Sequence, residues 1–138
     1  MSAHTPHQMS ARRPYAFTLI ELLVTVAAVA LLAAVAYPSY VNYMIRGNRS
    51  AAQQFMLDIA NAEAQYQIDA RGYTNIVGAG GLGLTPPTAV ANNYAFVIAL
   101  TAGPPPGYTL TATPIGRQAQ DGALTLDSLG NKGPIGKW

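Results

Sequence analysis

The 138-residue chain has no cysteine, which excludes a disulfide framework and any metal site built on thiolates. Its two histidines, His4 and His7, both lie at the very start of the chain. A nucleophile activated by histidine therefore cannot be assembled from the remaining residues. The carboxylates are scattered, and Asp121 and Asp127 alone make no cation cage. We expect no enzyme, no cofactor and no metal.

Charge is also scarce, because only 10% of the residues are ionisable at neutral pH. Arg12 and Arg13 precede a long apolar run, and the chain beyond residue 16 keeps six basic and six acidic side chains. The basic side chains are Arg46, Arg49, Arg71, Arg117, Lys132 and Lys137, and the acidic ones are Glu21, Asp58, Glu63, Asp69, Asp121 and Asp127. No broad cationic surface follows from this balance, so we do not expect nucleic acid as a partner.

The apolar run itself covers 21 residues, from Phe17 to Tyr37, and Glu21 is the one ionisable side chain within it. A helix of this length spans about 30 Å, which matches the hydrocarbon core of a bilayer. Arg12 and Arg13 on its N-terminal flank predict that this end stays in the cytoplasm. We therefore expect one pass through a membrane, with the rest of the chain facing the periplasm or the exterior.

The helical pattern continues beyond the apolar run. An apolar stripe with spacings of three and four consists of Ala52, Phe55, Ile59, Ala62 and Tyr66, while the polar and acidic residues fall mostly off it. Arg71 and Gly72 predict the end of the helix, with a base in the last turn and a glycine after it. Pro38 removes one backbone hydrogen bond and predicts a kink. The sequence thus predicts one helix from about residue 17 to 71.

Strand patterns follow in the C-terminal half. Residues 73–93 lack any period and predict a loop, whereas Tyr94–Leu100 is a continuous apolar run typical of a strand covered on both faces. Residues 108–113 and 124–127 alternate, and residues 129–133 predict a turn. We predict an α+β fold in which the long helix packs on an antiparallel sheet of three to four strands.

Residues 12–22 read Arg-Arg-Pro-Tyr-Ala-Phe-Thr-Leu-Ile-Glu-Leu. A basic leader, a small residue, a phenylalanine and an acid that opens a membrane helix resemble the signal of type IV prepilins and the related pseudopilins. The Tyr37-Pro38-Ser39-Tyr40 step is similar too, and segments 108–114 and 124–130 resemble the closing strands of PilE-type pilins. The resemblance covers most of the chain and implies a pilin fold.

The resemblance implies a leader over residues 1–16, a transmembrane and assembly helix over 17–37, and a periplasmic or pilus-surface domain over 38–138. A prepilin peptidase would cut between Ala16 and Phe17, and Phe17 would then be N-methylated. The implied partners are other pilin subunits, the peptidase, the inner-membrane assembly platform and, before assembly, the lipid bilayer. The final location would be an extracellular fibre.

The chain departs from the family's pattern at two places. Ala16 stands where glycine usually precedes the cut, and alanine is the next smallest side chain. PilE-type pilins also close a C-terminal loop with a cysteine pair, whereas here Lys137 precedes Trp138 and no cysteine exists. The segment from Asp121 to Trp138 must therefore be held by packing and hydrogen bonds alone.

Glu21 carries the assembly hypothesis. A carboxylate within a membrane helix costs about 2.5–3.5 kcal/mol on insertion scales, so such residues usually have a partner. Cleavage before Phe17 would create a positive amine one helical turn away from Glu21. In a filament, Glu21 of an arriving subunit could neutralise the amine of its neighbour in a medium of low dielectric constant. A buried pair of this kind sets register rather than raw stability.

Several alternatives stay open from the sequence. The run could be an ordinary secretory signal cleaved after the Ala34-Val35-Ala36 triplet, or a plain membrane anchor whose Glu21 reaches the cytoplasmic interface. Met9 could be the start residue, which would shorten the leader to eight residues. Within the pilin family, the chain could be a pseudopilin of a type II secretion system or a DNA-binding competence pilin.

The proposed cleavage makes the first testable prediction. Mass spectrometry of the protein from its native membrane or fibre should give a mature chain that begins at N-methylated Phe17. A chain that begins at Tyr37 would instead indicate a secretory signal. A chain that keeps Arg12 and Arg13 would contradict processing as a prepilin.

Overall fold

The computed structural model describes residues 17–138, so the predicted leader and Ala16 lie outside the described residues. The described chain falls into two compact units, which divide between Ser39 and Tyr40. Within the described residues, the first consists of Phe17, Thr18 and the part of the long helix up to Ser39. The second contains the remainder of that helix, a sheet and the connecting segments.

Helix α1 runs from Leu19 to Ala70 over 52 residues, which confirms the predicted long helix. Thr18 caps its start, because its hydroxyl oxygen accepts a hydrogen bond from the Glu21 amide at 3.3 Å. Pro38 lies inside the helix, which continues without a break on both sides of it. The kink at Pro38 stays a prediction.

The predicted end of the helix was wrong in detail. No base lies in the last turn, and the left-handed residue that follows Ala70 is Arg71, at a φ of 55°, rather than Gly72. Glycine is favoured at such a position because it has no Cβ to clash. Arg71 takes the conformation although a non-glycine residue there carries a steric cost.

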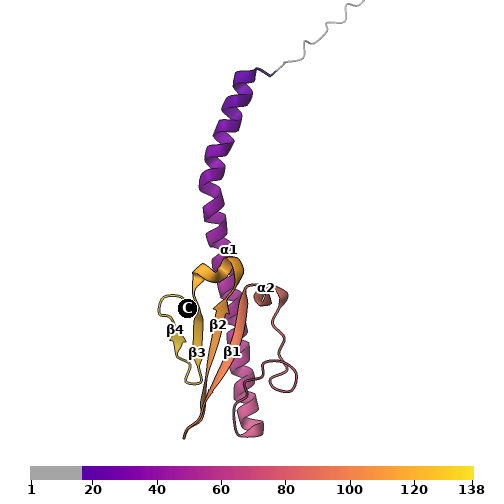
Figure 1. Cartoon of the computed structure of the whole chain (residues 1–138), viewed down its shortest axis with the longest axis vertical. Coiled ribbons are helices and arrows are strands. Elements are labelled where there is room, and N and C mark those ends of the chain that lie inside the picture. The colour runs from indigo at the N-terminus through magenta and orange to yellow at the C-terminus, as the bar shows by residue number, and fades with distance from the viewer. Residues whose placement is uncertain (1–16) are drawn as a thin grey trace, which may run out of the picture. The chain divides into compact units, whose positions relative to one another are not determined.

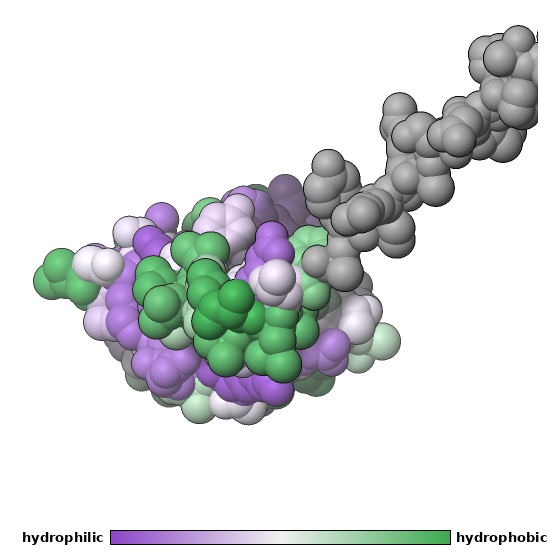
Figure 2. Space-filling view, turned by 90° about the horizontal axis from the view of Figure 1, so that it is seen from above, coloured by the Kyte–Doolittle hydropathy of each residue, from purple (hydrophilic) through white to green (hydrophobic). Residues whose placement is uncertain are grey.

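In the first unit the apolar side chains are exposed, from Leu19 at 82% to Val35 at 75%. Among the described residues, α1 is the one helix long and apolar enough to cross a membrane by length and composition. Figure 2 shows hydrophobic side chains gathered on the face seen from above. An apolar helix surface of this extent requires lipid or other protein to cover it.

The second unit contains a four-stranded antiparallel sheet of order β1-β2-β3-β4 (Figure 1). Its strands are β1 (Tyr94–Thr101), β2 (Gly107–Pro114), β3 (Leu124–Asp127) and β4 (Lys132–Gly133). The sheet confirms the predicted α+β fold and its strand number. Three short elements were not predicted: helix α2 (Thr88–Ala91), inside the expected loop, the 3-10 helix η1 (Gly116–Asp121), and strand β4, which lies within the turn expected over residues 129–133.

Strand β1 differs from its prediction as a strand covered on both faces. It is an edge strand, and only Tyr94 and Ile98 are buried, whereas Val97 is 60% and Leu100 is 48% exposed. A continuous apolar run cannot by itself distinguish a doubly covered strand from an edge strand with an apolar outer face. The outer face of β1 is therefore free within residues 17–138.

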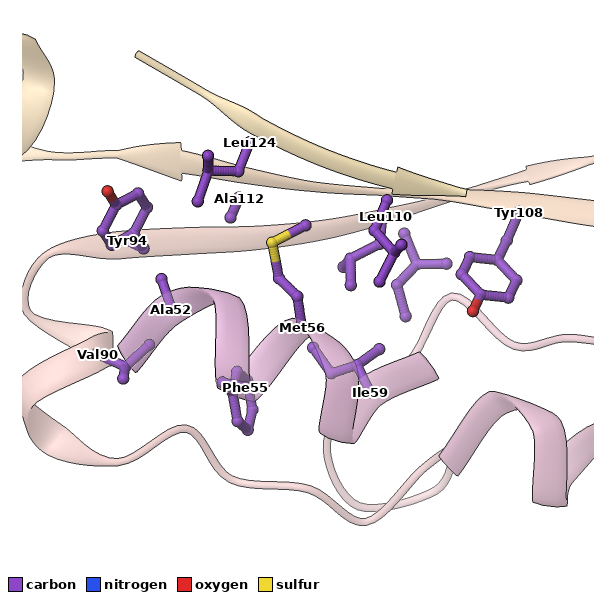
Figure 3. Close-up of a cluster of buried hydrophobic side chains, with 12 residues drawn as sticks. Ala52, Phe55, Met56, Ile59, Val90, Tyr94, Tyr108, Leu110, Ala112 and Leu124 are labelled. Atoms are coloured by element: carbon purple, nitrogen blue, oxygen red, sulfur yellow. The ribbon is translucent and has the colours of Figure 1, made fainter. Parts of the chain in front are cut away.

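The core lies between α1 and the inner face of the sheet (Figure 3). Met56 and Ile59 project from the helix towards Leu110 of β2, and all three are 0% exposed. Phe55 packs edge-on against Phe96 of β1, with ring centroids 5.0 Å apart. Burial of such side chains contributes about 1.5–3 kcal/mol each, so this contact holds the second unit together.

The predicted helix stripe is confirmed at Ala52, Phe55 and Ile59, while Ala62 and Tyr66 are only half-buried. Glu63 was expected among the polar residues off the stripe, yet it is 0% exposed. Its Oε2 accepts a hydrogen bond from the Thr74 amide at 3.2 Å, and its Oε1 has no partner among the described residues. Burial raises the pKa of this carboxyl group. Glu63 ties the residues after α1 back onto the helix.

Candidate functional sites

The start of α1 is the first candidate site. Phe17 precedes the helix and is 77% exposed, and Glu21 lies in the first turn. The Thr25 hydroxyl donates a hydrogen bond to the Glu21 carbonyl oxygen at 2.7 Å. This contact uses the backbone of Glu21 and not its carboxylate. Neither of the two ion pairs found within residues 17–138 includes Glu21. The described chain thus presents an exposed carboxylate four residues after Phe17.

The second candidate site is centred on Asp121, at the end of η1, which is only 3% exposed. One of its oxygens, Oδ2, accepts hydrogen bonds from Arg49 Nε at 2.9 Å, from the Tyr94 hydroxyl at 2.6 Å and from Gln118 Nε2 at 3.2 Å. Arg49 also pairs with Oδ1. Gln118 Nε2 further donates to the Ile45 carbonyl oxygen at 2.9 Å. These contacts join η1, β1 and α1 through one carboxylate.

This network controls the protonation of its members. Hydrogen bonds from Arg49, followed by those from Tyr94 and Gln118, lower the pKa of Asp121 to about 2 despite its burial. Burial, and then the contact with Asp121, raise the pKa of Tyr94 to about 12. Asp121 is therefore ionised and Tyr94 neutral at physiological pH.

The C-terminal segment is held without a disulfide, as the sequence required. Gln53 of α1 donates a hydrogen bond to the Lys137 carbonyl oxygen at 2.6 Å, and Trp138 Nε1 donates to the Gly133 carbonyl oxygen at 2.9 Å. The Lys132 ammonium lies 4.9 Å from the centroid of the Trp138 ring, which is cation–π geometry. The Trp138 side chain also packs against the hydrophobic core. These contacts fix the last residues to α1 and the sheet.

A hollow of about 480 Å³ lies beside this network. We call it the basic hollow, and its lining residues are Asn42, Ile45, Arg46, Arg49, Gln120, Asp121 and Lys137. Lys137 Nζ lies 4.0 Å from Asp121 Oδ1, and Arg46 is exposed, with its Nε donating to the Asn42 carbonyl oxygen at 3.3 Å. Three cations thus surround one carboxylate.

Sequence reasoning missed both the network and the basic hollow. Nothing in the spacing along the chain indicates that the Arg49 side chain binds a buried acid 72 residues away. The one available signal of a shared surface is the spacing of Arg46 and Arg49, because residues three apart on a helix lie on the same side of it.

Comparison with known proteins gives two family matches that meet at Pro38. A family model described as the prokaryotic N-terminal methylation motif matches residues 12–37, which include Phe17 and Glu21. A family model described as the type IV minor pilin ComP, DNA uptake sequence receptor, matches residues 38–126, which is 89 of the 138 residues. The chain belongs to the type IV pilin family. Residues 38–126 form a ComP-like minor pilin domain.

Individual type IV pilins agree with this assignment. The type IV wide pilus major component PilA4 of Thermus thermophilus is 33% identical over 102 residues, which cover 67% of this chain and 78% of that protein. The fimbrial protein EcpC of Eikenella corrodens is 29% identical over 120 residues, covering 85% of this chain and 76% of that protein. The type IV major pilin protein PilA of Myxococcus xanthus is 29% identical over 87 residues, or 63% of this chain and 38% of that protein.

Membership of this family confirms the resemblance drawn from residues 12–22. Type IV pilins are structural subunits, so the family also agrees with the expectation of no enzymatic activity. The roles of Ala16, Phe17, Glu21 and Pro38 are not tested by these matches and remain predictions.

The Asp121 network predicts a stability effect. Arg49→Gln should lower the free energy of unfolding by about 3 kcal/mol at pH 7, because it removes the closest cation from a buried carboxylate and leaves only Lys137, whose Nζ lies 4.0 Å from Oδ1. The folded-state pKa of Asp121, about 2, lies below its ordinary value of 3.8. The pair's contribution is therefore complete above about pH 4 and is lost as the pH falls towards 2. Urea unfolding of the detergent-solubilised full chain, followed by Trp138 fluorescence, measures both.

Arg46→Gln is the matched control, because Arg46 is exposed and lies outside the Asp121 ion pairs. This variant should change the free energy of unfolding by no more than about 0.5 kcal/mol. Equal costs for the two substitutions would contradict the assigned network, as would a cost for Arg49→Gln that does not shrink below pH 4.

Proposed function

We propose that this pilin is a structural subunit of a type IV pilus, cut between Ala16 and Phe17 and polymerised through its N-terminal helix. Before assembly it is a single-pass inner-membrane protein with a cytoplasmic N-terminus, and afterwards part of an extracellular fibre. Its partners are other pilin subunits, the prepilin peptidase that also methylates Phe17, and the inner-membrane assembly platform.

The observation that carries this proposal is the exposed apolar surface of residues 17–37 together with an acid in its first turn. From Leu19 to Val35 the large apolar side chains are 57–82% exposed, so the helix needs a bilayer or other helices around it. A membrane anchor alone has no use for Glu21, whose desolvation opposes insertion. A filament provides both an apolar environment and a cation for Glu21, the amine of a neighbouring Phe17.

The second unit suits the outer layer of such a fibre. Its core is complete without the apolar segment, since all of the core residues lie beyond residue 51. The three relatives described above are named as pilus or fimbrial proteins. These names favour a pilus over the alternative of a type II secretion pseudopilus.

Loss of the Glu21 charge tests this assembly mechanism. Glu21→Ala should reduce the amount of pilus on the cell surface by at least about tenfold, because the amine of the neighbouring subunit is left unpaired in an apolar environment. Immunoblots of sheared fibres measure assembly, and blots of the membrane fraction measure insertion, which should remain at the level of the unmodified chain.

Asp69→Asn is the control, because this acid is exposed on α1 outside the apolar segment. It should leave both the membrane pool and the fibre unchanged. Normal fibres from Glu21→Ala would refute the pairing, and a loss of the membrane pool would assign Glu21 to insertion instead.

A DNA-uptake pilin is the second candidate function. The match of residues 38–126 to a DNA uptake sequence receptor model favours it, and so does the gathering of Arg46, Arg49 and Lys137 around one hollow. The equal numbers of acids and bases beyond residue 16 still oppose a broad cationic surface.

This candidate predicts that the full chain in neutral detergent shifts a short duplex on a native gel. The affinity should fall linearly with salt on logarithmic axes, with a slope of about −0.9 for each phosphate contacted. Absence of any shift at about 50 mM salt would exclude the candidate.

A further inference from the structure

We propose that the basic hollow binds the phosphate of an anionic phospholipid headgroup at the outer surface of the inner membrane while the subunit awaits assembly. The inference rests on the proposed membrane-inserted state and assigns a ligand to Arg46 and Lys137, the two cations of the hollow that lie beyond the Arg49–Asp121 pair. It concerns the second unit, whereas assembly depends on the apolar segment.

The net charge of the residues that line the hollow is positive and favours the binding of an anion. Asp121 is the only acid among the lining residues, and its carboxylate is already occupied by Arg49, Tyr94 and Gln118. Arg46 and Lys137 add two positive charges, of which Lys137 lies 4.0 Å from the same carboxylate. The lining therefore carries a formal charge of +2, from three cations and one anion. A phosphate between Arg46 and Lys137 would reduce this excess.

The walls of the hollow are fixed before any ligand arrives. Gln118 joins η1 to α1 through the Ile45 carbonyl oxygen, and Gln53 of α1 holds the Lys137 carbonyl oxygen at 2.6 Å. Asp121 orients Arg49 through two contacts. A site whose cations are already held loses less conformational entropy on binding. Its volume of about 480 Å³ lies within the range of small-molecule sites.

The position of the hollow along the chain points to the membrane surface. Asn42, the first lining residue, follows the end of the apolar run at Tyr37 by five residues, which span about 8 Å as a helix and at most about 18 Å when extended. One headgroup layer is about 5–8 Å deep. Side chains on a helix lean towards its N-terminus, and Arg46 bends the same way, to the Asn42 carbonyl oxygen. The length of chain between the apolar run and Asn42, taken as helix, therefore matches the depth of one headgroup layer.

A lipid fits these observations better than DNA does. Proteins that bind duplex DNA through its backbone neutralise several phosphates spread along the helix. Here two cations beyond the Arg49–Asp121 pair converge on one small hollow, which suits a single phosphate. The positive-inside rule does not explain Arg46. That rule concerns basic residues on the cytoplasmic side of a membrane helix, and the predicted topology places Arg46 on the opposite side.

Native mass spectrometry of the full chain released from nanodiscs tests this inference. The chain from phosphatidylglycerol nanodiscs should retain one lipid, and the chain from phosphatidylcholine nanodiscs should retain none. Arg46→Gln and Lys137→Gln should each reduce the retained fraction about fivefold, the effect of one cation near a membrane surface. Arg117→Gln removes the same charge from an exposed residue of η1 outside the lining, and should retain lipid like the unmodified chain.

Equal retention of the two lipids would overturn the proposal, as would equal losses for Arg46→Gln and Arg117→Gln. A duplex-binding arm completes the design: if Arg46→Gln and Lys137→Gln weaken DNA binding but not lipid retention, the hollow is a nucleic-acid contact and the proposal fails. Retention is measured on inserted chains whether or not they form fibres. A failure of the assembly mechanism would therefore appear in the fibre blots and leave the lipid result readable.

Discussion

The contact between residues 52–59 of α1 and the inner face of the sheet supports everything else in the second unit. The strands β3 and β4 contain four and two residues, too few to be stable without a partner surface. Met56 and Ile59 provide that surface by filling the space against Leu110. Once this contact is made, α1 and the sheet hold their polar side chains at fixed separations, which allows residues far apart in sequence to meet.

The polar cluster around Asp121 depends on that packing and extends it. Three side chains donate hydrogen bonds to the buried Asp121 carboxylate, and Gln53 and Gly133 bind the last two residues. A disulfide acts chiefly by constraining the unfolded chain, whereas this network acts only when the fold is already formed. Arg46 and Lys137 lie beside this network and line the basic hollow.

The two units meet different physical requirements within one helix. The first has an apolar surface and one acid, so it needs surroundings of low dielectric constant. The second buries one stripe and leaves charged side chains outside. A subunit that passes from a bilayer into a fibre needs both, because its helix changes neighbours while its outer domain stays in water.

The sequence by itself determined the long helix, an α+β fold with three to four strands and the pilin family, because period, length and the residues around Phe17 are local properties. Only the tertiary structure decided that Glu63 is buried, that β1 is an edge strand and that Arg49 binds Asp121. Those outcomes depend on which surfaces meet, and no spacing along the chain encodes a contact between residues 72 positions apart. The basic hollow arises in the same way, since α1, η1 and the C-terminus build it together.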